Sequence, residues 1–529
     1  MVAMPALMTD AVARLAEHAE RRPDSLLLAT RGREYAYADF ARRADAVAAA
    51  LRAAGLAPAR RVALFLEEYD QFFVAMFGVW LAGGVVVPLN TSLPRRDVDG
   101  LLVKSSPDLV VVPDEATLPD VGLPRLVVRT DAGGLVDGLE PAGGAAPAGG
   151  LAGAAAPAAG LDAAGSPAGG LDGASSPVGP DELAMLMFTS GTTGVPKAVC
   201  QTLRALSSNP GYVAQVLGLG AGDRIFINTP PYFTSGICHF LTLMAHGGGT
   251  AGQLGFYFGE GLLDEMERLG CSGFGGAPAH LVRVVEPLEG PRATGLRFWV
   301  SSGDHLPLPV IERFRRLLPA VALFNMYGLT EVSGRLCVLP PGELDARPGS
   351  VGRPIGDMRV RALDAEGREL PPGETGELYV TGSLLMQGYL DEPGITARTL
   401  TAHGLRSGDF GHVDADGYVW IAGRKDDIIK RGGEKVSTVH VQQALMALER
   451  FADVAVIAAP DEILGHVPVA FVVPLEPEGF KATRVLRELR DLLPSSSLPS
   501  RIVAVREIPR TGSGKAVRAE LRALLEAAG

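Results

Sequence analysis

The first part of the chain alternates helix-like and strand-like hydrophobic patterns. Between Asp39 and Ala54 the apolar positions recur at helical spacing and share one helical face; they are Phe40, Ala44, Val47 and Leu51. The next apolar run, RVALFLE at 61–67, predicts a buried strand. Similar alternation continues to about residue 130, and this alternation favours an α/β fold.

The most apolar stretch of the chain is FFVAMFGVWLAGGVVVPLN at 72–90. It is interrupted by Gly83, Gly84 and Pro88. A membrane span needs about 20 uninterrupted apolar residues. The pattern therefore predicts a buried helix, a turn and a short buried strand, and no membrane span.

The pattern changes in the second half of the chain. Period-two alternation surrounds the DAEG and DADG turns of MRVRALDAEGREL (358–370) and HVDADGYVWIAGR (412–424), so we expect β-hairpins between 350 and 422. From about Arg424 to Gly529, the strand-like runs DVAVIAAP, VAFVVP and RIVAVRE alternate with helical segments. A block of about 100 residues is long enough to form a small separate domain.

The segment between these parts, 140–180, consists mostly of Ala, Gly and Pro. It contains an internal repeat of ten residues, marked by Pro147, Pro157, Pro167 and Pro177, with Leu151, Leu161 and Leu171 in step. The repeat has too little apolar bulk to build a solenoid. We interpret it as a flexible low-complexity insert that can be shortened without loss of activity.

Length and charge narrow the class of protein. A chain of 529 residues is too long to fold around a single hydrophobic core, so at least two domains are expected. The net charge of −11 and the pI near 5.4 argue against a nucleic-acid partner, which requires a basic face. An anionic substrate must therefore meet a local cationic site or a metal ion.

Cysteine usage and the N-terminus indicate a cellular compartment. The four cysteines (Cys200, Cys238, Cys271 and Cys337) form no CxxC motif, which fits a reducing environment and neither a zinc site nor a disulfide framework. The N-terminal segment has acidic residues early and no long apolar core, unlike a signal peptide. We therefore expect a cytoplasmic protein.

The stretch FTSGTTGVPKAV (188–199) has the composition of an anion-binding loop. Glycines let backbone N–H groups converge on phosphate oxygens, because no Cβ blocks the approach. Hydroxyl groups add donors and Lys197 adds a cation; the loop comprises Thr189, Ser190, Gly191, Thr192, Thr193, Gly194 and Lys197. The P-loop pattern is not matched, since Pro196 precedes the lysine and Ala198 follows it. Taken alone, the loop is an anion site or a surface turn.

Five further motifs follow in a fixed order: NMYGLTE (325–331), GELYVTG (376–382), SGDFG (407–411), GRKDDIIKRGGEKVS (423–437) and PRTGSGK (509–515). Together with the loop, they resemble the acyl-adenylate-forming superfamily, which includes acyl-CoA synthetases, aryl-acid-activating enzymes, peptide-synthetase adenylation domains and firefly luciferase. The resemblance covers nearly the whole chain outside the insert. It implies a large N-terminal domain (1–425) of α/β subdomains plus a small β-barrel-like region, followed by a small mobile α+β C-terminal domain (426–529).

The resemblance also implies a reaction and an ATP site. A carboxylate attacks the α-phosphate of ATP, pyrophosphate leaves, and a thiol then attacks the acyl-AMP. The loop would hold the β- and γ-phosphates, Glu331 would bind Mg²⁺, and Thr330 would bind the α-phosphate. The other nucleotide contacts it implies are Tyr327 and Gly328 at adenine, Asn325 at the exocyclic amine, Gly303 and Asp304 at the adenine edge, and Asp409 with Arg424 at ribose. The alternatives are a core tyrosine at Tyr327 and solvated surface charges at Asp409 and Arg424.

The C-terminal motifs carry the remaining implied roles. Lys515 would bridge the attacking carboxylate and the α-phosphate, and the alternative is an exposed, solvated lysine. Asp426 occupies the hinge position between the two domains. Gly432 and Gly433 would line the channel for a pantetheine arm.

Three positions depart from the common form of the family. Ala198 stands where many relatives have glycine, and Leu203 and Thr234 stand where histidine is frequent. The segment TPPYFTSG (229–236) borders the acyl pocket, so walls from Phe233, Ser235, Gly236 and the loop around Gly303 are expected. These departures affect the choice of acid and the second step, in which the thiol attacks the acyl-AMP. The residues of the pocket favour an aromatic or medium-sized acid.

The expected cofactors and partners are ATP, Mg²⁺, a small carboxylic acid and coenzyme A. A carrier-protein phosphopantetheine is the alternative acceptor, although an acidic surface suits an acidic carrier poorly. The substituted histidines leave a third alternative, a non-thiol nucleophile such as an amine or a small inorganic anion. A nucleotide-binding protein without catalysis is a further alternative, against which Glu331, Asp409 and Lys515 argue.

Overall fold

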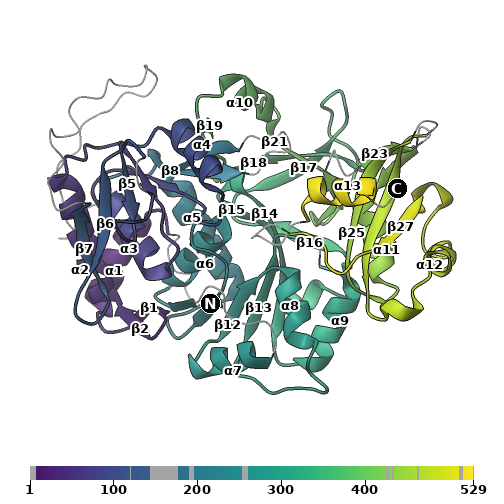
Figure 1. Cartoon of the computed structure of the whole chain (residues 1–529), viewed down its shortest axis with the longest axis horizontal. Coiled ribbons are helices and arrows are strands. Elements are labelled where there is room, and N and C mark those ends of the chain that lie inside the picture. The colour runs from purple at the N-terminus through teal and green to yellow at the C-terminus, as the bar shows by residue number, and fades with distance from the viewer. Residues whose placement is uncertain are drawn as a thin grey trace.

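A computed structural model describes residues 8–118, 121–142, 177–189, 196–252, 260–304, 306–424, 428–431, 434–461, 464–510 and 516–527. Within these residues the strands form three sheets, which lie side by side from the N-terminal part at the left of Figure 1 to the C-terminal part at the right. The repeat segment 143–176 lies outside the described residues.

The N-terminal sheet has eight strands in the order β19-β9-β8-β4-β3-β5-β6-β7. Their bounds are β3 Arg61–Leu64, β4 Val85–Pro88, β5 Leu109–Val112, β6 Arg125–Thr130, β7 Val136–Pro141, β8 Leu183–Thr189, β9 Lys197–Thr202 and β19 Gly388–Tyr389. Strands β3, β4 and β5 pair in parallel and are almost entirely buried, as all-apolar runs such as VVVP require.

The central sheet has fourteen strands, with β20 paired to β21 off the main path. In spatial order they are β17 Arg359–Leu363, β18 Gly376–Thr381, β21 Gly404–Val413, β22 Val419–Arg424, β16 Ser350–Pro354, β15 Gly334–Leu339, β14 Ala322–Leu329, β13 Phe298–Ser302, β12 Gly273–Gly276, β10 Arg224–Ile227, β11 Gly249–Gly252, β1 Leu26–Thr30 and β2 Arg33–Ala36, with β20 Leu400–Thr401. The strands of the expected barrel-like region (β16, β17, β18, β21 and β22) thus continue the α/β sheet through β16.

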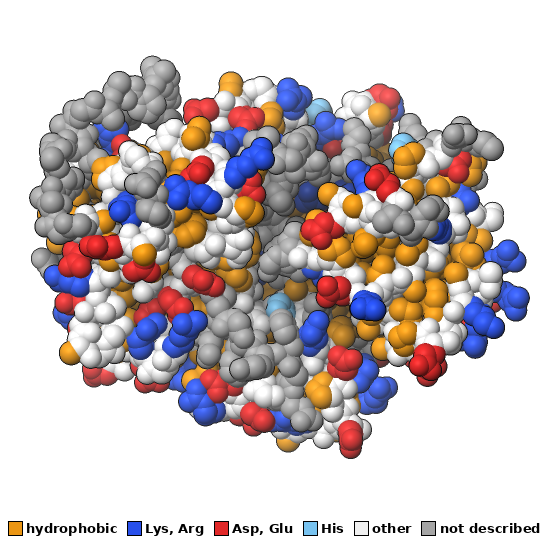
Figure 2. Space-filling view, in the orientation of Figure 1, with side chains coloured by type: hydrophobic (Ala, Val, Ile, Leu, Met, Phe, Trp, Pro, Cys, Tyr) orange, Lys and Arg blue, Asp and Glu red, His pale blue; other side chains and the backbone are white. Residues whose placement is uncertain are grey.

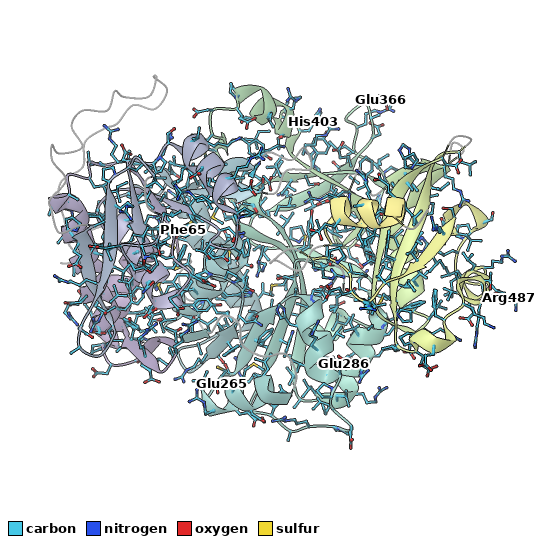
Figure 3. All side chains as sticks on the ribbon, in the orientation of Figure 1. Phe65, Glu265, Glu286, Glu366, His403 and Arg487 are labelled. Carbon is cyan, nitrogen blue, oxygen red and sulfur yellow. The ribbon has the colours of Figure 1, made fainter. Side chains whose placement is uncertain are left out.

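The C-terminal sheet has five strands: β23 Ile428–Arg431, β24 Glu434–Ser437, β25 Phe451–Asp461, β26 Gly465–Pro474 and β27 Arg501–Ala504. It has core clusters of its own on its two faces. Side chains fill these layers, while Glu286 and Arg487 lie on the outer surface (Figure 3).

Helices cover the sheets on both sides (Figure 1). They are α1 Ala11–Arg21, α2 Tyr37–Ala53, α3 Tyr69–Leu81, α4 Arg95–Ser105, α5 Leu203–Leu217, α6 Thr234–Met244, α7 Glu260–Arg268, α8 Pro278–Val285, α9 Leu308–Leu317, α10 Pro393–Thr399, α11 Thr438–Met446, α12 Ala482–Leu489 and α13 Arg518–Ala527. No helix in the described ranges is long and apolar enough to cross a membrane.

The hydrophobic patterns place most of these elements correctly. Helix α2 buries its predicted face, and α3, a turn and β4 replace the single apolar stretch as expected. The DADG hairpin forms between β21 and β22. The chain also folds back at the DAEG turn, where an antiparallel bridge joins Leu363 to Glu369, and β17 then pairs mainly with β18. The PPGET segment that follows begins with two prolines, which cannot donate to a strand ladder.

Gly328 shows how closely β14 and β15 approach each other. The register shifts between Tyr327 and Gly328, and a Cβ on Gly328 would lie 1.8 Å from the carbonyl oxygen of Gly334. Only a residue without a side chain fits there.

We therefore expect Gly328→Ala to lower the free energy of unfolding by about 2–4 kcal/mol, because the two strands must separate to admit the methyl group. Gly222→Ala is the matched control, since no atom lies within 4 Å of the place where its Cβ would stand. Chemical denaturation of both variants measures the difference; equal stabilities would contradict the packing argument.

Candidate active site

The ends of the glycine-rich loop are held together by a strand pair. Thr189 ends β8 and lies opposite Lys197, which begins β9, in an antiparallel ladder. The loop residues between them that the motif implicates (Ser190, Gly191, Thr192, Thr193 and Gly194) lie outside the described residues. The ladder therefore fixes where the loop leaves and re-enters the sheet.

Glu331 and Lys197 meet on the two sides of Tyr389. The Tyr389 hydroxyl donates to Glu331 Oε1 at 2.9 Å, and Lys197 Nζ lies 5.1 Å from the centre of the Tyr389 ring. Burial, followed by the charge of Glu331, raises the pKa of Tyr389, so the hydroxyl stays protonated and donates. A lysine, an aromatic ring and a carboxylate thus come together from three distant parts of the chain.

Tyr389 was missed in the sequence. Its only signal there is the dipeptide GY, and a lone aromatic residue is usually part of a core. Its position comes from β19, which pairs Tyr389 with Val199 on β9.

Buried amides hold the turn that carries Glu331. Gln201 Nε2 donates to the Thr330 carbonyl, and Ser333 Oγ donates to Gln201 Oε1 at 2.6 Å. Asn209 Nδ2 donates to the carbonyls of Val332 at 3.1 Å and Arg335 at 2.6 Å. Because both amides are fully buried, the carboxylate is carried on a rigid turn.

Tyr327, Asp409 and Arg424 form a second cluster, as the motifs predict. The Tyr327 hydroxyl donates to Asp409 Oδ2, and Arg424 Nε lies 3.2 Å from Asp409 Oδ1. The ladder of β21 and β22 places Asp409 directly opposite Arg424. Burial, followed by the charge of Asp409, raises the pKa of Tyr327 well above its ordinary value. Tyr327 packs against the main core cluster and is partly exposed.

Asn325 and the loop after β13 lie next to this cluster along the sheet. Asn325 is buried, and its amide nitrogen donates to the Ser350 carbonyl at 3.1 Å, which leaves the amide oxygen for an amine of a ligand. Gly303 has a φ of 97° and is exposed. Asp304 forms an ion pair with Arg510 at 3.5 Å, and Arg510 also binds Asp453 at 2.5 Å. Asp304 therefore contacts the segment that leads to Lys515.

Helix α6 follows Phe233 and carries Ser235 and Gly236, the residues predicted to form a wall of the acid pocket. Phe233 precedes the helix, and Ser235 lies partly exposed in its first turn. Gly236 is buried, and a Cβ there would lie 2.4 Å from the Pro230 carbonyl oxygen, so this glycine serves close packing. A small, mostly apolar cavity adjoins the helix; it is lined by Met185, Met187, Gln201, Leu206, Thr234, Ile237, Cys238 and Ser333.

The structure gives a physical reason for two of the unusual residues. Ala198 is fully buried on the face of β9 opposite Lys197, in the hydrophobic cluster that contains Val110 and Leu186. Leu203 is fully buried at the start of α5, where a histidine would lose its hydration. Thr234 lines the small cavity, so only this departure lies at the expected acid site.

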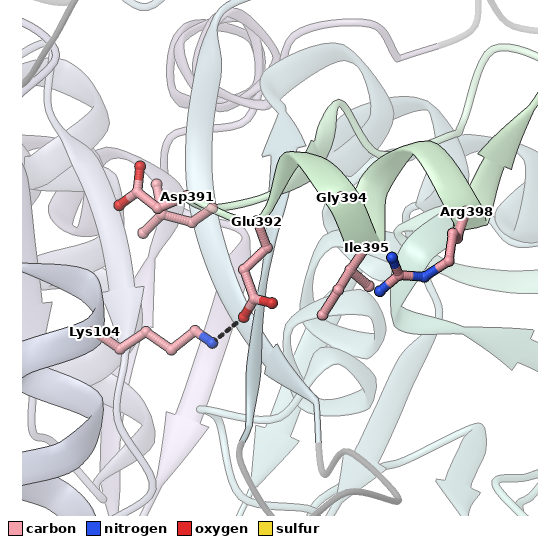
Figure 4. A pocket seen from close by; sticks show the side chains of 7 residues that line it. Lys104, Asp391, Glu392, Gly394, Ile395 and Arg398 are labelled. Atoms are coloured by element: carbon pink, nitrogen blue, oxygen red, sulfur yellow. Dashed lines mark hydrogen bonds and ion pairs between the residues drawn. The ribbon is translucent and has the colours of Figure 1, made fainter.

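A more open pocket of about 580 Å³ lies on the outer side of β19, beside α10. Figure 4 shows that Lys104 points toward Glu392 within it, and the two form an ion pair. Leu390, which lines the pocket, packs in the hydrophobic cluster that contains Val98 and Val110. Tyr389 packs in the largest hydrophobic cluster of the protein, which is a different one. The pocket is therefore separate from the Glu331 cluster, and its lysine is already neutralised.

The residues present fit a magnesium ion bound together with a nucleotide. Glu331 supplies a carboxylate, yet no group of three acidic, histidine or cysteine side chains able to hold a metal occurs in the described part of the chain. Mg²⁺ keeps several waters and binds through one or two carboxylates plus phosphates, which matches a single Glu331.

In Figure 2, acidic and basic side chains are interspersed over the visible face.

Four of the residues selected from the sequence motifs, Lys515, Asp426, Gly432 and Gly433, lie outside the described residues. Arg510 and Ala516 on either side of the lysine segment form an antiparallel bridge, which brings the ends of that segment together.

Taken together, the fold and these clusters indicate an α/β enzyme that binds a nucleotide. The AMP-binding enzyme family matches residues 15–390, and the C-terminal domain of AMP-binding enzymes matches residues 440–515. The chain belongs to the AMP-binding enzyme family, as the motifs indicated.

Individual relatives match over nearly their whole length. The chain is 29% identical to a sulfoacetate–CoA ligase of Cupriavidus necator, covering 98% of each protein. It is 30% identical to a fatty acid–[acyl-carrier-protein] ligase of Streptomyces coeruleorubidus, covering 96% of this chain and 94% of the relative. The crystal structure of ATP-bound MatB from Rhodopseudomonas palustris is similar with a TM-score of 0.83 and 26% identity, over 98% of this chain and 99% of that one.

The Tyr389 hydroxyl provides a test of the Glu331 cluster. We expect Tyr389→Phe to weaken MgATP binding about tenfold, because removing a hydrogen bond that orients a metal ligand costs about 10–100-fold in metal affinity. Titration calorimetry at several Mg²⁺ concentrations measures this without knowledge of the acid.

Tyr379→Phe is the matched control, since Tyr379 lies on β18 and its ring contacts His403. Unchanged MgATP affinity in Tyr389→Phe would remove Tyr389 from the site.

Proposed function

We propose that this protein is an ATP-dependent acid–thiol ligase that forms AMP, with coenzyme A as the acceptor. The observation that carries the proposal is a pair of side-chain clusters on the N-terminal and central sheets. One contains Lys197, Tyr389 and Glu331, and the other contains Tyr327, Asp409 and Arg424. A cation and a metal-binding carboxylate suit the phosphates, and a partly exposed tyrosine beside a carboxylate suits a nucleoside.

The first step joins an acid to AMP. A carboxylate oxygen of the acid attacks the α-phosphorus of ATP, the bond to the β-phosphate oxygen breaks, and pyrophosphate leaves. Both reactants are anions, so the site must supply positive charge where negative charge develops. Lys197 with the loop residues from Thr189 to Gly194 binds the leaving phosphates, and Thr330 binds the α-phosphate. Glu331 would hold Mg²⁺, which would supply positive charge at the phosphates.

The nucleoside is held at the second cluster. Asp409 accepts hydrogen bonds from the ribose hydroxyls while the ion pair with Arg424 holds the carboxylate in place. Tyr327 and Gly328 lie against the adenine, Asn325 Oδ1 accepts from its amine, and Gly303 with Asp304 borders its edge.

The second step transfers the acyl group. The thiol sulfur attacks the acyl carbon of the acyl-AMP, the bond to the phosphate oxygen breaks, and AMP leaves. We infer that the C-terminal domain begins near residue 426, with Asp426 as the hinge, and that it carries Lys515 to the first step. Gly432 and Gly433 admit the pantetheine arm in the second.

The names of the relatives support coenzyme A as acceptor and keep a carrier protein as the alternative. The acids named for the relatives differ widely, so the substrate is not carried over from them. The four cysteines form no disulfide, in keeping with our inference that the enzyme works in the cytoplasm.

An exchange assay tests the proposal. Isotope exchange between pyrophosphate and ATP is screened against aliphatic, aromatic and amino acids, and each active acid is then given coenzyme A, a carrier protein or an amine. We expect acid-dependent exchange, followed by thioester formation with coenzyme A. If no acid supports conversion of ATP to AMP, the proposed function is wrong.

Lys515→Ala should abolish exchange and leave ATP binding largely intact, because the ammonium acts on the charge that builds in the transition state. Lys481→Ala, an exposed lysine of the same region, is the control and should retain activity. Exchange at the wild-type rate in Lys515→Ala would overturn the role of this lysine.

A further inference from the structure

Arg335 is a buried cation without an anionic partner among the described residues. It lies on β15, directly after the turn that carries Glu331, and the residue is only 6% exposed. With the described residues its guanidinium makes one hydrogen bond, from Nη2 to His239 Nε2 at 3.1 Å. No carboxylate within the described ranges lies inside ion-pair distance of it. A guanidinium remains charged in proteins, so its burial requires compensation.

The neighbours of Arg335 supply no negative charge. Burial, followed by the charge of Arg335, lowers the pKa of His239 well below its ordinary value, so the imidazole is neutral and Nε2 accepts the hydrogen bond. The adjacent Cys238 is a thiol, because burial raises its pKa to about 11. Its Sγ donates to the Ser333 carbonyl at 3.2 Å.

The other buried charges in the described part of the chain are compensated. Arg43, which is 4% exposed, binds Asp39 at 2.7 Å and Asp131 at 2.8 Å. The buried aspartates are paired as well: Asp70 with Arg33, Asp223 with Arg297 and Asp409 with Arg424. Among the described residues, Arg335 alone breaks this rule, which points to a charge that arrives with a ligand.

The position of Arg335 relates it to the acid pocket. His239 lies one helical turn after Ser235 on α6, on the same side of the helix. Its ring packs flat against Gly275 of β12, where a Cβ would lie 2.4 Å from His239 Cε1. The carboxyl ends of β12 and β13 follow immediately at Gly276 and Ser302, and such ends form the ligand side of an α/β sheet.

The anchored turn fixes how far this cation is from the reacting centre. Arg335 N donates to Asn209 Oδ1 at 3.2 Å, and the same amide binds the Val332 carbonyl. Glu331 and Arg335 therefore belong to one rigid segment, with Glu331 toward the phosphates and Arg335 beneath α6. A substrate that reaches from the first to the second can be recognised at both ends.

We propose that the acid substrate carries a second anionic group, a carboxylate or a sulfonate, and that this group pairs with Arg335 while the first carboxylate is adenylated. The inference rests on the proposed function and specifies its substrate class. A guanidinium binds a planar carboxylate through two hydrogen bonds, and four of its five N–H groups are not used by His239. His239 is a positioning residue that holds the guanidinium toward the pocket.

The test compares acids of equal chain length that differ in one charge. AMP formation in the presence of coenzyme A is measured for malonate, succinate and glutarate against propionate, butyrate and pentanoate, and for 3-sulfopropionate as the sulfonate. The wild-type enzyme should prefer the dianion of at least one pair by about 100-fold in kcat/KM, the scale expected for a paired buried charge.

Arg335→Met, which keeps the volume and removes the charge, should abolish this preference and allow the monoanionic acid to react at least as well. Arg359→Met is the control, since Arg359 is exposed on β17, and it should leave the preference unchanged. Thermal unfolding and MgATP binding establish whether Arg335→Met is folded. If Arg335→Met does not fold, the preference of the wild-type enzyme for dianionic over monoanionic acids tests the inference by itself.

The outcomes separate this inference from the proposed function. Turnover of monoanionic acids with no dianion preferred, or an unchanged preference in a folded Arg335→Met, overturns the role of Arg335 and leaves the ligase intact. Absence of AMP formation with every acid, including those of the wider exchange screen, overturns the ligase itself. A preference for 3-sulfopropionate over the dicarboxylates supports the inference and identifies the second group as a sulfonate.

Discussion

Two fully buried amides, Gln201 and Asn209, hold the turn from Thr330 to Arg335 through its backbone carbonyls, a backbone N–H and the Ser333 hydroxyl. The turn leaves the end of β14, and Ser333 within it has a left-handed φ of 61°, which a free chain would rarely adopt. Each buried hydrogen bond would leave an unsatisfied group if it were lost, so the amides make this backbone path obligatory. This backbone path sets the positions of the Glu331 carboxylate and the Arg335 guanidinium.

This anchoring joins the N-terminal and central sheets. Gln201 lies on β9, whose first residue is Lys197, so one short strand carries the loop lysine and supports the turn of Glu331. Tyr389 closes the arrangement, because β19 pairs with β9 and delivers the hydroxyl to Glu331. The second cluster depends on a different ladder, that of β21 and β22, which sets Asp409 opposite Arg424. The first cluster thus combines residues of both sheets, whereas the second is built by the central sheet alone.

The sequence predicted elements whose signal is local. The interrupted stretch at 72–90, the DADG hairpin and the strand before the glycine-rich loop follow from patterns within a few residues. Tyr327, Asp409 and Arg424 could be named because they stand in recognisable motifs. Gln201 and Asn209 could not, since they reach partners 129 and 126 residues away and look like ordinary polar residues in a strand and a helix. For Arg335, the informative feature is a missing counter-charge among the described residues, which depends on the three-dimensional surroundings.

Arg510 connects the C-terminal sheet to the large domain through an exposed aspartate. It binds Asp453 within its own sheet and Asp304 after β13, whose side chain is 38% exposed. An ion pair at the surface is worth only about 0–1 kcal/mol and weakens with salt. The contact between Arg510 and Asp304 can therefore break at little cost in free energy. A higher ionic strength should therefore make it easier for the C-terminal sheet to separate from the loop after β13, because salt screens this ion pair.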